Sequence, residues 1–427
     1  MQLPAGGHSL KVLVIGSGGR EHALAWRLTR CASVEKVYTA PGNPGIAQVA
    51  ECVPAMRNEQ WLALAQEKEI DLTVVGPEAP LVTGLVDLFR GHNLAIFGPT
   101  QAAAQLEGSK AFSKAFMSRA GIPTARSITV DTPEDAKRAL DQFGTPVVLK
   151  ADGLAAGKGV VIADERKQAM AVIDELMAAR GRLIIEEFLA GEEVSFIVVS
   201  DGRNVLPLQP TQDHKQVWDG DRGPNTGGMG AYSDQTILTS EQTSDIIASI
   251  IMPTIEHMSS EGNPFTGFLY AGLMMTTEGP KVLEFNARLG DPETQPLMQR
   301  LDSDFAEVLL SAARGQLGGT TLKWQNDPSV CVVVSAQGYP GHVKTGDLIH
   351  GLDEAEQTGA KVFHAGTKRT EKGLETSGGR VLGVTASAPD LAAAIRHVYS
   401  AVAQVHFRGM HYRTDIGAKG LRRSAAW

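Results

Sequence analysis

The polar side chains best suited to chemistry lie close together in the sequence KVLEFNARLGDPETQ. Side chains alternate across a β-strand with a period of two, so Glu284, Asn286 and Arg288 should share one face while Leu283 and Phe285 share the other. Polar and charged groups are costly to bury unless they find partners. The pattern therefore indicates either an ion pair that fixes the sheet or a strand whose polar face binds a ligand.

A first glycine-rich turn follows the apolar segment KVLVI. In GSGGRE, Glu21 stands where a dinucleotide fingerprint has its third glycine, and no acidic residue follows the second predicted strand to bind a ribose, so an NAD site is disfavoured. Backbone N–H groups at the start of a helix, with Arg20 nearby, would suit one phosphate. The alternative is a turn that only packs a strand against a helix. The sequences GNPG at 42–45 and GPEAPL at 76–81 would line the same crevice.

A second glycine-rich loop, in LKADGLAAGKGVVIA, follows Lys150 and joins two predicted strands. A Walker A loop would lead into a helix, but here Gly159 leads into the strand VVIA, so the loop is not a P-loop. A lysine and a flexible flap that contains Gly157 and Lys158 can still close over a triphosphate. The alternative is a hairpin loop with solvent-exposed lysines.

The predicted elements that carry these residues fall into three parts behind an extension at 1–9. Alternating strands and helices over 10–108 indicate a parallel sheet that binds ligands at the carboxyl ends of its strands. Residues 109–325 contain a helix, a smaller α/β stretch, a glycine-dense loop at WDGDRGPNTGGMGAYS and a hairpin with Glu278 and Gly279 at its turn. Strands and a late helix over 326–427 indicate a small α+β domain. The expected class is a multidomain α/β and α+β protein.

Composition limits the classes of partner. The chain has 427 residues, 43% hydrophobic and 21% charged, which suits a globular protein of several domains. A net charge of -8 without basic blocks argues against nucleic-acid and polybasic membrane partners. The three cysteines are far apart and suggest neither disulfides nor zinc, and no signal peptide or membrane span is visible. We therefore expect a cytoplasmic protein.

The order of EGSKAF, the Lys150 flap, IIEEFLAGEEVSF and LEFNARLGDPETQ resembles that of the ATP-grasp ligases. The sequences GSGGREHALAW, GPEAPL, DGLAAGKGV, QDHK, GPNTGGMGAYS and GFLYAGLM are similar to those of one family among them, the phosphoribosylamine glycine ligases. The similarity extends from about Lys11 to Ile416. It implies an N-terminal pre-ATP-grasp domain that binds phosphoribosylamine, a two-lobed ATP-grasp domain over 109–325 with its lid lobe at about 124–190, and a small C-terminal domain.

The resemblance also implies roles for individual residues. The residues that bind ATP would be Lys110, Lys150, Gly157, Lys158, Glu186, Glu187, Phe188, Leu189 and Glu193. Glu284 and Asn286 would bind Mg²⁺ or Mn²⁺, and Arg288 would act with Lys150 in catalysis by neutralising charge on the transferred phosphoryl group. The residues that bind the other substrates would be Gly16, Gly18, Gly19, Arg20, Glu21, Asn43, Pro44, Glu78, Asp213, Lys215, Asp291 and Pro292.

The implied reaction belongs to purine biosynthesis and has two steps. ATP would phosphorylate the carboxylate of glycine, and the amine of 5-phosphoribosylamine would attack the glycyl phosphate to give glycinamide ribonucleotide, ADP and phosphate. The intermediate hydrolyses readily, so the flap near Gly157 and the loop at 223–230 would exclude water as lids. The phosphate of phosphoribosylamine would bind the Gly16–Arg20 turn. We expect a monomer that acts on small molecules.

Two features depart from the family pattern. Many ATP-grasp enzymes have a further acidic metal ligand on the partner strand, but no Asp or Glu occurs between Glu261 and Glu278, so a two-metal site would need Glu284 to bridge or Asp213 to help. The segment before Arg182 is also short, which could shift the adenine contacts. For TQDHKQ, a polar surface turn is as good an interpretation as a role for Asp213 in the site.

Three other functions compete with this one. The nearest is an ATP-grasp ligase for a different carboxylate or amine. A nucleotide-dependent oxidoreductase built on the first domain is disfavoured by the missing glycine and ribose acid. A non-catalytic nucleotide sensor would bind ATP without turning it over.

Overall fold

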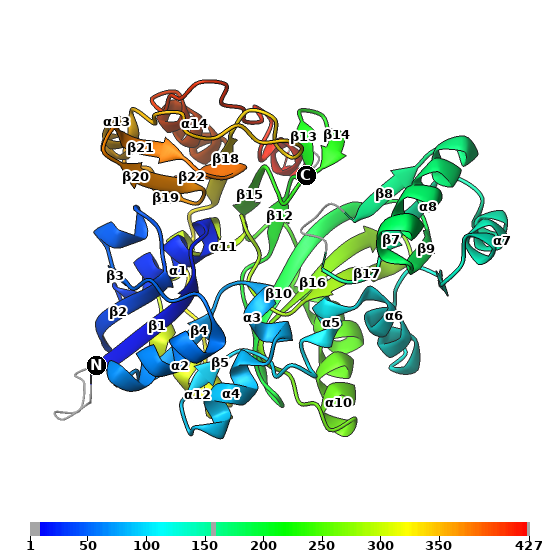
Figure 1. The fold of residues 1–427 in the computed structure, drawn as a ribbon, viewed down its shortest axis with the longest axis horizontal. Helices are drawn as coiled ribbons and strands as arrows, with labels where there is room; N and C mark the ends of the chain where they lie inside the picture. The colour runs from blue at the N-terminus through cyan, green and yellow to red at the C-terminus, as the bar shows by residue number, and fades with distance from the viewer. Residues whose placement is uncertain (1–8, 155–158, 425–427) are drawn as a thin grey trace.

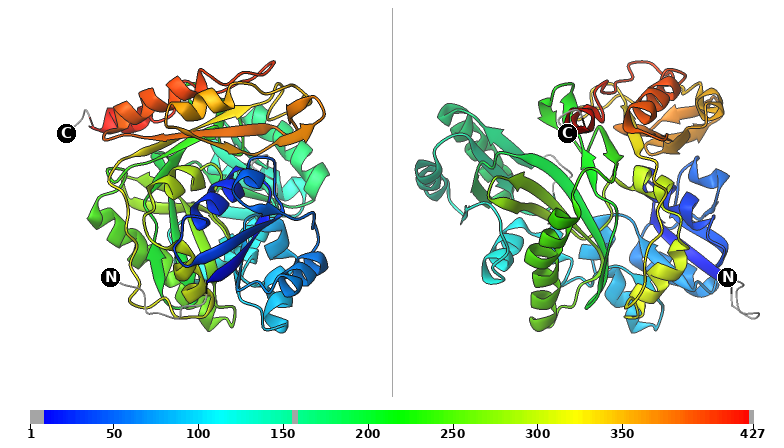
Figure 2. Two further views of the ribbon diagram at one scale, coloured as in Figure 1. Left: turned by 90° about the vertical axis from the view of Figure 1, so that its left-hand side faces the viewer. Right: turned by 180° about the vertical axis from the view of Figure 1, so that it is seen from behind.

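The computed structural model describes residues 9–154 and 159–424 (Figure 1). Three regions are arranged around a central sheet: an N-terminal parallel sheet, a lid lobe that projects to one side, and a C-terminal region that lies over the N-terminal one (Figures 1 and 2). Among the described residues, none of the helices combines the length and the apolar character needed to cross a membrane.

The N-terminal region is a fully parallel sheet with the strand order β3-β2-β1-β4-β5. Its strands are β1 (Leu10–Gly16), β2 (Val34–Pro41), β3 (Glu51–Cys52), β4 (Leu72–Val75) and β5 (Ile96–Phe97). Its helices are α1 (Gly19–Leu28), α2 (Asn58–Glu67), α3 (Glu78–Val82) and α4 (Leu85–Gly91), with the short helix η1 (Ile46–Gln48). The run of four buried apolar residues from Val12 to Ile15 is typical of a strand covered on both faces. The predicted parallel sheet is confirmed.

The lid lobe is a second, antiparallel sheet with its own hydrophobic core. Its elements are β6 (Ser127–Val130), α7 (Pro133–Phe143), β7 (Val147–Ala151), β8 (Val160–Ala163), α8 (Arg166–Arg180) and β9 (Leu183–Glu187), and the helices α5 (Gln105–Gly108) and α6 (Lys110–Arg119) precede it. Thr132 caps α7 by accepting a hydrogen bond from the Asp135 N–H, and Pro133 starts the helix, as sequence preferences would predict. The chain enters this lobe through the segment before β6 and leaves it through the segment after β9.

The central sheet runs without interruption into the C-terminal region. Its order is β17-β16-β10-β12-β15-β18-β22-β19, with β11 on β10. The strands are β10 (Glu192–Asp201), β11 (Val205–Pro207), β12 (Thr211–Asp213), β15 (Gly230–Ser233), β16 (Thr266–Thr276), β17 (Gly279–Asn286), β18 (Ser329–Ser335), β19 (Lys361–His364) and β22 (Arg380–Ser387). The predicted boundary near 325 lies in a loop, but β15 pairs with β18 across it. The C-terminal region is thus not a separate compact unit, because it shares a sheet with the central region.

Helices and two small hairpins complete the fold. They are α9 (Ser240–Ile246), η2 (Ile247–Ile251), α10 (Met252–Ser260), α11 (Thr294–Arg300), α12 (Phe305–Ala313), α13 (Leu352–Gln357), α14 (Leu391–Val402) and α15 (Ala418–Ser424), with the hairpins β13 (Gln216–Trp218) to β14 (Arg222–Asn225) and β20 (Thr367–Thr370) to β21 (Gly373–Thr376). The glycine-dense segment predicted as a loop in fact forms β14 and β15. Its glycines suggested a loop, but pairing with β13 and β18 supplies the hydrogen bonds of strands.

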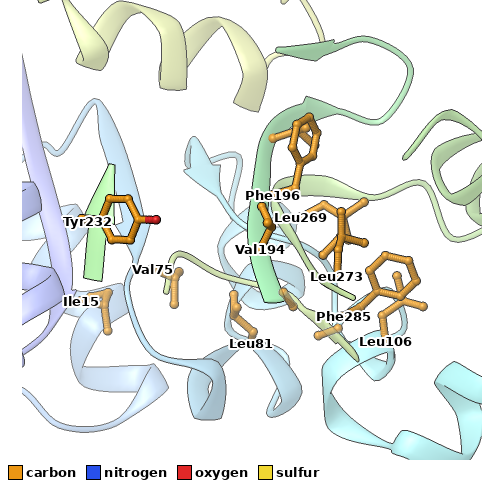
Figure 3. Packing of buried hydrophobic residues seen from close by; sticks show 14 of the residues in the cluster. Ile15, Val75, Leu81, Leu106, Val194, Phe196, Tyr232, Leu269, Leu273 and Phe285 are labelled. Atoms are coloured by element: carbon orange, nitrogen blue, oxygen red, sulfur yellow. The ribbon is translucent and has the colours of Figure 1, made fainter. Parts of the chain in front are cut away.

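The hairpin of β16 and β17 differs from its prediction in two ways. Thr276 pairs with Gly279, so the turn residues are Thr277 and Glu278. A bulge also shifts the register at Leu283, and an extra residue in a strand changes which face the neighbouring side chains occupy. Val282 and Phe285 therefore point into the main core, where Figure 3 shows Phe285 beside Leu106 and Leu273. Leu283 instead packs with Ala125, Leu189 and Met274. The prediction that Leu283 and Phe285 share a face was wrong.

Two buried histidines join the N-terminal and C-terminal regions and should make the fold sensitive to acid. The His364 N–H donates to Nδ1 of His22 at 2.8 Å. Burial, with Lys361 nearby, lowers the pKa of His364 to about 4, and burial lowers the pKa of His22 well below its ordinary value of 6.5. The unfolded chain therefore takes up protons first as the pH falls, and the free energy of unfolding should decrease between pH 6.5 and about 4.

Urea titrations at pH 7.5 and 5.5 would measure this loss. His364→Asn keeps a polar atom near Thr367 but cannot titrate, so its urea midpoint should fall less between the two pH values than that of the wild type. An equal fall in both proteins would contradict the assignment of acid sensitivity to this junction.

Candidate active site

A cleft of about 410 Å³ lies where the lid lobe, the central sheet and the N- and C-terminal regions meet. Most of the predicted site residues line it: Arg20, Glu78, Lys110, Lys150, Glu186, Glu187, Phe188, Leu189, Glu193, Asp213, Lys215, Glu284, Asn286, Arg288 and Asp291. These residues come from positions up to 271 apart in the sequence, so the fold collects in one place groups that the chain keeps separate. Gly157 and Lys158 were also predicted to bind ATP and lie outside the described residues.

Lysines on one side of the cleft surround a single carboxylate. Lys150, near the end of β7, and Lys114, on α6, both place Nζ on Oε2 of Glu186, at 3.0 and 3.1 Å. Lys150 also donates to the Leu283 carbonyl at 2.8 Å, and Lys110 donates to the Gly153 carbonyl at 2.9 Å. Among the described residues, Oε1 of Glu186 has no hydrogen-bond partner. Two ammonium groups against one carboxylate leave a net positive charge that suits a phosphate chain.

On the opposite side of the cleft, Arg288 pairs with two acidic residues, and neither of them is Glu284. Its guanidinium contacts Glu107 at 2.9 Å and Glu78 at 3.2 Å, and it donates to Oδ1 of Asn286 at 3.3 Å. Although burial opposes it, the pKa of Arg288 is held above its ordinary value by Glu107 and Glu78. The alternative of a Glu284–Arg288 pair that fixes the sheet therefore fails, because Arg288 takes its carboxylates from the N-terminal region and α5.

Glu284 makes no hydrogen bond or ion pair among the described residues. Burial acts to raise its pKa, but the positive charges of Lys215, Lys150, Lys110 and Arg288 outweigh burial and lower the pKa below its ordinary value. An ionised carboxylate beside the amide oxygen of Asn286 is the donor set that a hard divalent cation prefers. The residues present therefore fit a magnesium ion. The described part of the chain contains no group of three or more acidic, histidine or cysteine side chains that could hold a metal ion.

The first glycine turn holds a carboxylate where we predicted a phosphate. Glu21 is 2% exposed, and its Oε2 accepts the Gly18 N–H at 2.6 Å while its Oε1 accepts from Nε of Arg20 at 2.6 Å. A Cβ on Gly18 or Gly76 would lie 2.8 or 2.1 Å from these oxygens, so the glycines make room for the Glu21 side chain. The Gly18 N–H is thus already bonded to an anion of the protein, and the phosphate-binding role of this turn stays a prediction.

Several other residues that we predicted to bind a substrate do not line the cleft: Gly16, Gly19, Glu21, Asn43, Pro44 and Pro292. Asn43 is fully used, since it donates to the Ser17 and His364 carbonyls and accepts from two backbone N–H groups. It ties the N-terminal sheet to β19. Pro292 packs on Gly228, where a Cβ would lie 2.4 Å from the proline ring and where φ is +113°. Sequence motifs mark these residues, but they do not distinguish ligand contacts from the packing that supports them.

Asp213 and Lys215 do face the cleft, which excludes a surface turn. Lys215 contacts Glu193 at 2.8 Å. Burial raises the pKa of Asp213 to about 7, with Lys215 opposing the shift and Glu293 adding to it. Glu293 lies beneath them and accepts hydrogen bonds from Tyr270 at 3.0 Å and Ser195 at 3.2 Å. This end of the cleft is therefore rich in carboxylates and can bind a cationic group.

Sequence reasoning missed four charged residues that line the cleft: Glu107, Lys114, Glu293 and Arg380. Lys114 lies one helical turn after Lys110, so it could have been found from the i, i+4 spacing. Glu293 is part of the quoted GDPETQ sequence. Arg380 reaches the cleft from β22 and contacts Asp291 at 3.3 Å. No local pattern indicates Arg380, because only the fold brings the C-terminal region to this site.

Comparison with known proteins gives three family matches along the chain. The family models for phosphoribosylglycinamide synthetase match residues 10–107 with the N domain, 108–294 with the ATP-grasp (A) domain and 329–419 with the C domain. The phosphoribosylamine–glycine ligases of Ralstonia nicotianae and Escherichia coli K12 are 51% and 50% identical to the chain, over 97% of it and 100% and 99% of their own lengths. A crystal structure of phosphoribosylamine–glycine ligase from Thermotoga maritima is 35% identical, with a TM-score of 0.83 over 95% of this chain and 100% of that one.

The fold is shared more widely than the sequence. The biotin carboxylase domain of Hydrogenobacter thermophilus 2-oxoglutarate carboxylase, crystallised with MgADP and bicarbonate, has a TM-score of 0.72 at 19% identity over 94% of this chain and 92% of that one. At this identity the likeness concerns the fold alone.

Proposed function

The chain belongs to the phosphoribosylglycinamide synthetase family, and on that premise we propose that it joins glycine to 5-phosphoribosylamine through a glycyl phosphate, with the residue roles given below. It is an ATP-dependent ligase of purine biosynthesis. One observation supports the proposed roles above all others: Lys110, Lys150, Glu284, Asn286 and Arg288 border a single cleft.

ATP lies between the lid lobe and β17 in this proposal. The segment from Glu186 to Leu189 takes the adenine edge, and the free Oε1 of Glu186 accepts its amino group. Leu283, which the bulge turns toward Leu189 and Met274, supplies an apolar surface for the base. Lys110 and Lys150 bind the phosphates. The carboxylate of Glu193 would bind the ribose hydroxyls. Lys215 contacts the same carboxylate, so the hydroxyls would compete with Lys215 for it.

A divalent cation, Mg²⁺ or Mn²⁺, would be held by Glu284 and Asn286. When bound there it neutralises and orients phosphate oxygens. Arg288 lies next to this pair and carries its charge into the cleft, where it offsets the negative charge that grows on the phosphoryl group during transfer. Because Glu78 and Glu107 hold the guanidinium in place, its position costs little reorganisation during the reaction.

The reaction then proceeds by two displacements. A carboxylate oxygen of glycine attacks the γ-phosphorus of ATP, the bond to the bridging oxygen breaks, and ADP leaves. The neutral amine of phosphoribosylamine attacks the carbonyl carbon of the glycyl phosphate, phosphate leaves with the C–O electron pair, and the new amide nitrogen loses a proton. Exclusion of water between the steps protects the intermediate from hydrolysis.

Phosphoribosylamine binds at the end of the cleft shared by the N- and C-terminal regions. We place its phosphate toward Arg20 and Arg380, since Glu21 occupies the glycine turn and guanidinium groups bind phosphate well. Glu78 and Asp291 lie nearby to accept from ribose hydroxyls. We also propose that the enzyme acts as a monomer in the cytoplasm, with small molecules as its substrates.

Incubation with ATP, glycine and enzymatically made phosphoribosylamine tests the substrate assignment. Phosphate release should require all three compounds. Release confined to another carboxylate or amine would favour a different ATP-grasp ligase, and ATP binding without turnover would favour a sensor.

The intermediate can be tested separately with ATP labelled with ¹⁸O at the β,γ-bridge. In the presence of glycine alone, reversible formation of glycyl phosphate should move the label into non-bridging positions of the β-phosphate. Retention of the label with glycine present would contradict this mechanism.

Lys150→Met should weaken ATP binding about ten- to a hundred-fold, since a hydrogen bond to a charged group contributes about 1.5 to 3 kcal/mol. Its ammonium has two protein acceptors and a third N–H left for a phosphate. Calorimetric titration with MgADP measures the effect. Lys167→Met, at an exposed position on α8 in the same lobe, is the matched control and should bind as the wild type does. Unchanged affinity in Lys150→Met would remove this lysine from the site.

A further inference from the structure

Lys114 lines the cleft, yet its ammonium is already saturated by the protein. Its side chain is buried, and Nζ lies 2.8 Å from Oγ1 of Thr124, 3.0 Å from the Ala125 carbonyl and 3.1 Å from Oε2 of Glu186. An ammonium group has three N–H donors, so these acceptors use all of them. Lys150, by comparison, has only two protein acceptors. The lysine that sequence reasoning missed therefore differs from its neighbours in having no donor to spare for a ligand.

The acceptors of Lys114 lie on the two segments that connect the lid lobe to the rest of the chain. Thr124 and Ala125 precede β6, and Glu186 is near the end of β9. The two segments also contact each other, since the Arg126 N–H donates to the Glu187 carboxylate at 2.9 Å and the Glu187 N–H donates to the Arg126 carbonyl at 3.0 Å. Lys114 itself belongs to α6, outside the lobe, so its side chain links the lobe to the body of the molecule.

The connection before β6 is tied as well to β17, the strand that carries Glu284 and Asn286. Thr124 accepts from Lys114 and donates its own hydroxyl to the Val282 carbonyl on β17 at 2.6 Å, and the Val282 N–H donates to the Pro123 carbonyl at 2.8 Å. A continuous set of hydrogen bonds therefore runs from β17, through Thr124 and Lys114, to Glu186. Any displacement of Lys114 would change the separation of β17 from the segment that follows Glu186.

We propose that Lys114 is a positioning residue for the nucleotide: it fixes the Glu186–Leu189 segment relative to β17 and makes no contact with ATP. This inference rests on the proposed function, which assigns that segment to adenine. Lys114 determines where the base binds, whereas Lys150 and Lys110 bind the phosphates.

The charge of the cluster agrees with this role. Burial lowers the pKa of Lys114 to about 8, with Glu186 opposing the shift and Lys150 adding to it. The ammonium form still predominates at pH 7 and can make all three hydrogen bonds. Without Lys114, Oε2 of Glu186 would keep Lys150 as its cation. Oγ1 of Thr124 and the Ala125 carbonyl would lose the buried N–H donor that now bonds to them. Both connections of the lobe would therefore be held less firmly.

Binding of two nucleotides distinguishes positioning from phosphate contact. Lys114→Met should weaken MgADP and adenosine by the same factor, about tenfold, as expected for the loss of a buried charged hydrogen bond. Lys150→Met should weaken MgADP much more than adenosine. In turnover, Lys114→Met should raise KM for ATP by a similar factor and change kcat little. A loss confined to MgADP would make Lys114 a phosphate ligand and overturn the proposal, as would unchanged affinity for both compounds.

Two further variants secure the test. Arg119→Met removes an exposed guanidinium from the same helix, where it pairs with Glu261, and should bind both nucleotides as the wild type does. Thr124→Val removes one acceptor of Lys114 and keeps the lysine, so it should show the same equal losses, only smaller. If Lys114→Met does not fold, Thr124→Val decides: equal losses support the role, and unchanged binding overturns it. A wild-type protein that binds nucleotide but does not use glycine would contradict the proposed substrates and leave this test intact.

Discussion

Glu284→Gln should lower kcat/KM by about 10³-fold, the scale on which enzymes lose rate when a group that stabilises developing charge is removed. The substitution keeps the size of the side chain and removes its negative charge, and among the described residues Glu284 makes no ion pair or hydrogen bond that the substitution would break. Steady-state assays over a range of Mg²⁺ concentrations measure the effect. High Mg²⁺ should restore part of the activity, because the remaining oxygen ligands bind the cation less tightly.

Glu278→Gln is the matched control for this prediction. Glu278 lies at the turn of the same hairpin, is exposed, and pairs with Lys281. Its substitution should leave both the rate and the Mg²⁺ dependence unchanged. A rate near that of the wild type for Glu284→Gln at low Mg²⁺ would show that the polar face of β17 does not bind the cation.

Arg288→Lys should lower kcat by about 10³-fold, the size of the effect of an arginine that stabilises phosphoryl transfer. Lysine keeps one positive charge but loses the planar fork by which Arg288 contacts Glu78 and Glu107 together and still faces the cleft. An interaction made chiefly in the transition state appears in kcat more than in KM, so KM for ATP should change only a few-fold.

The lysine variant is preferable to methionine because Arg288→Met would leave the carboxylates of Glu78, which is partly buried, and Glu107 close together without the cation that pairs with both. Burial already raises the pKa of Glu107, with Arg288 opposing the shift. Thermal unfolding should place Arg288→Lys close to the wild type and Arg288→Met well below it. A folded Arg288→Lys protein with a normal kcat would contradict the catalytic role and leave Arg288 as a structural ion-pair residue.

Local patterns in the sequence predict much of this site because several of its residues follow strands directly. Lys150, Glu284 and Asn286 lie at or near the ends of β7 and β17, and glycine turns mark the edge of the N-terminal sheet. Period-two alternation and turn residues are local properties of the chain, so they can be read without knowing the fold. The parallel sheet and the hairpin of β16 and β17 were predictable for the same reason.

The remaining features depend on contacts between distant segments. The bulge at Leu283 lies in the pairing with β16, and it turns Leu283 toward Leu189 and Met274. Gly16 and Gly18 make room for Glu21 within the first turn, but Gly76 approaches it from another strand end. Arg380 enters the site because β18 continues the central sheet into the C-terminal region. The contact of Gly76 with Glu21 and the position of Arg380 on the cleft each join segments that are far apart in the sequence, so local motifs could not indicate them.

A crystal structure with a non-hydrolysable ATP analogue and Mg²⁺ is the most direct test of the shared cleft. It should show one triphosphate that contacts Lys150 on one side and, through the metal ion, Glu284 on the other, with adenine against the Glu186–Leu189 segment. An analogue bound elsewhere, or a metal ion remote from Glu284 and Asn286, would contradict the central claim that these groups act on a single nucleotide.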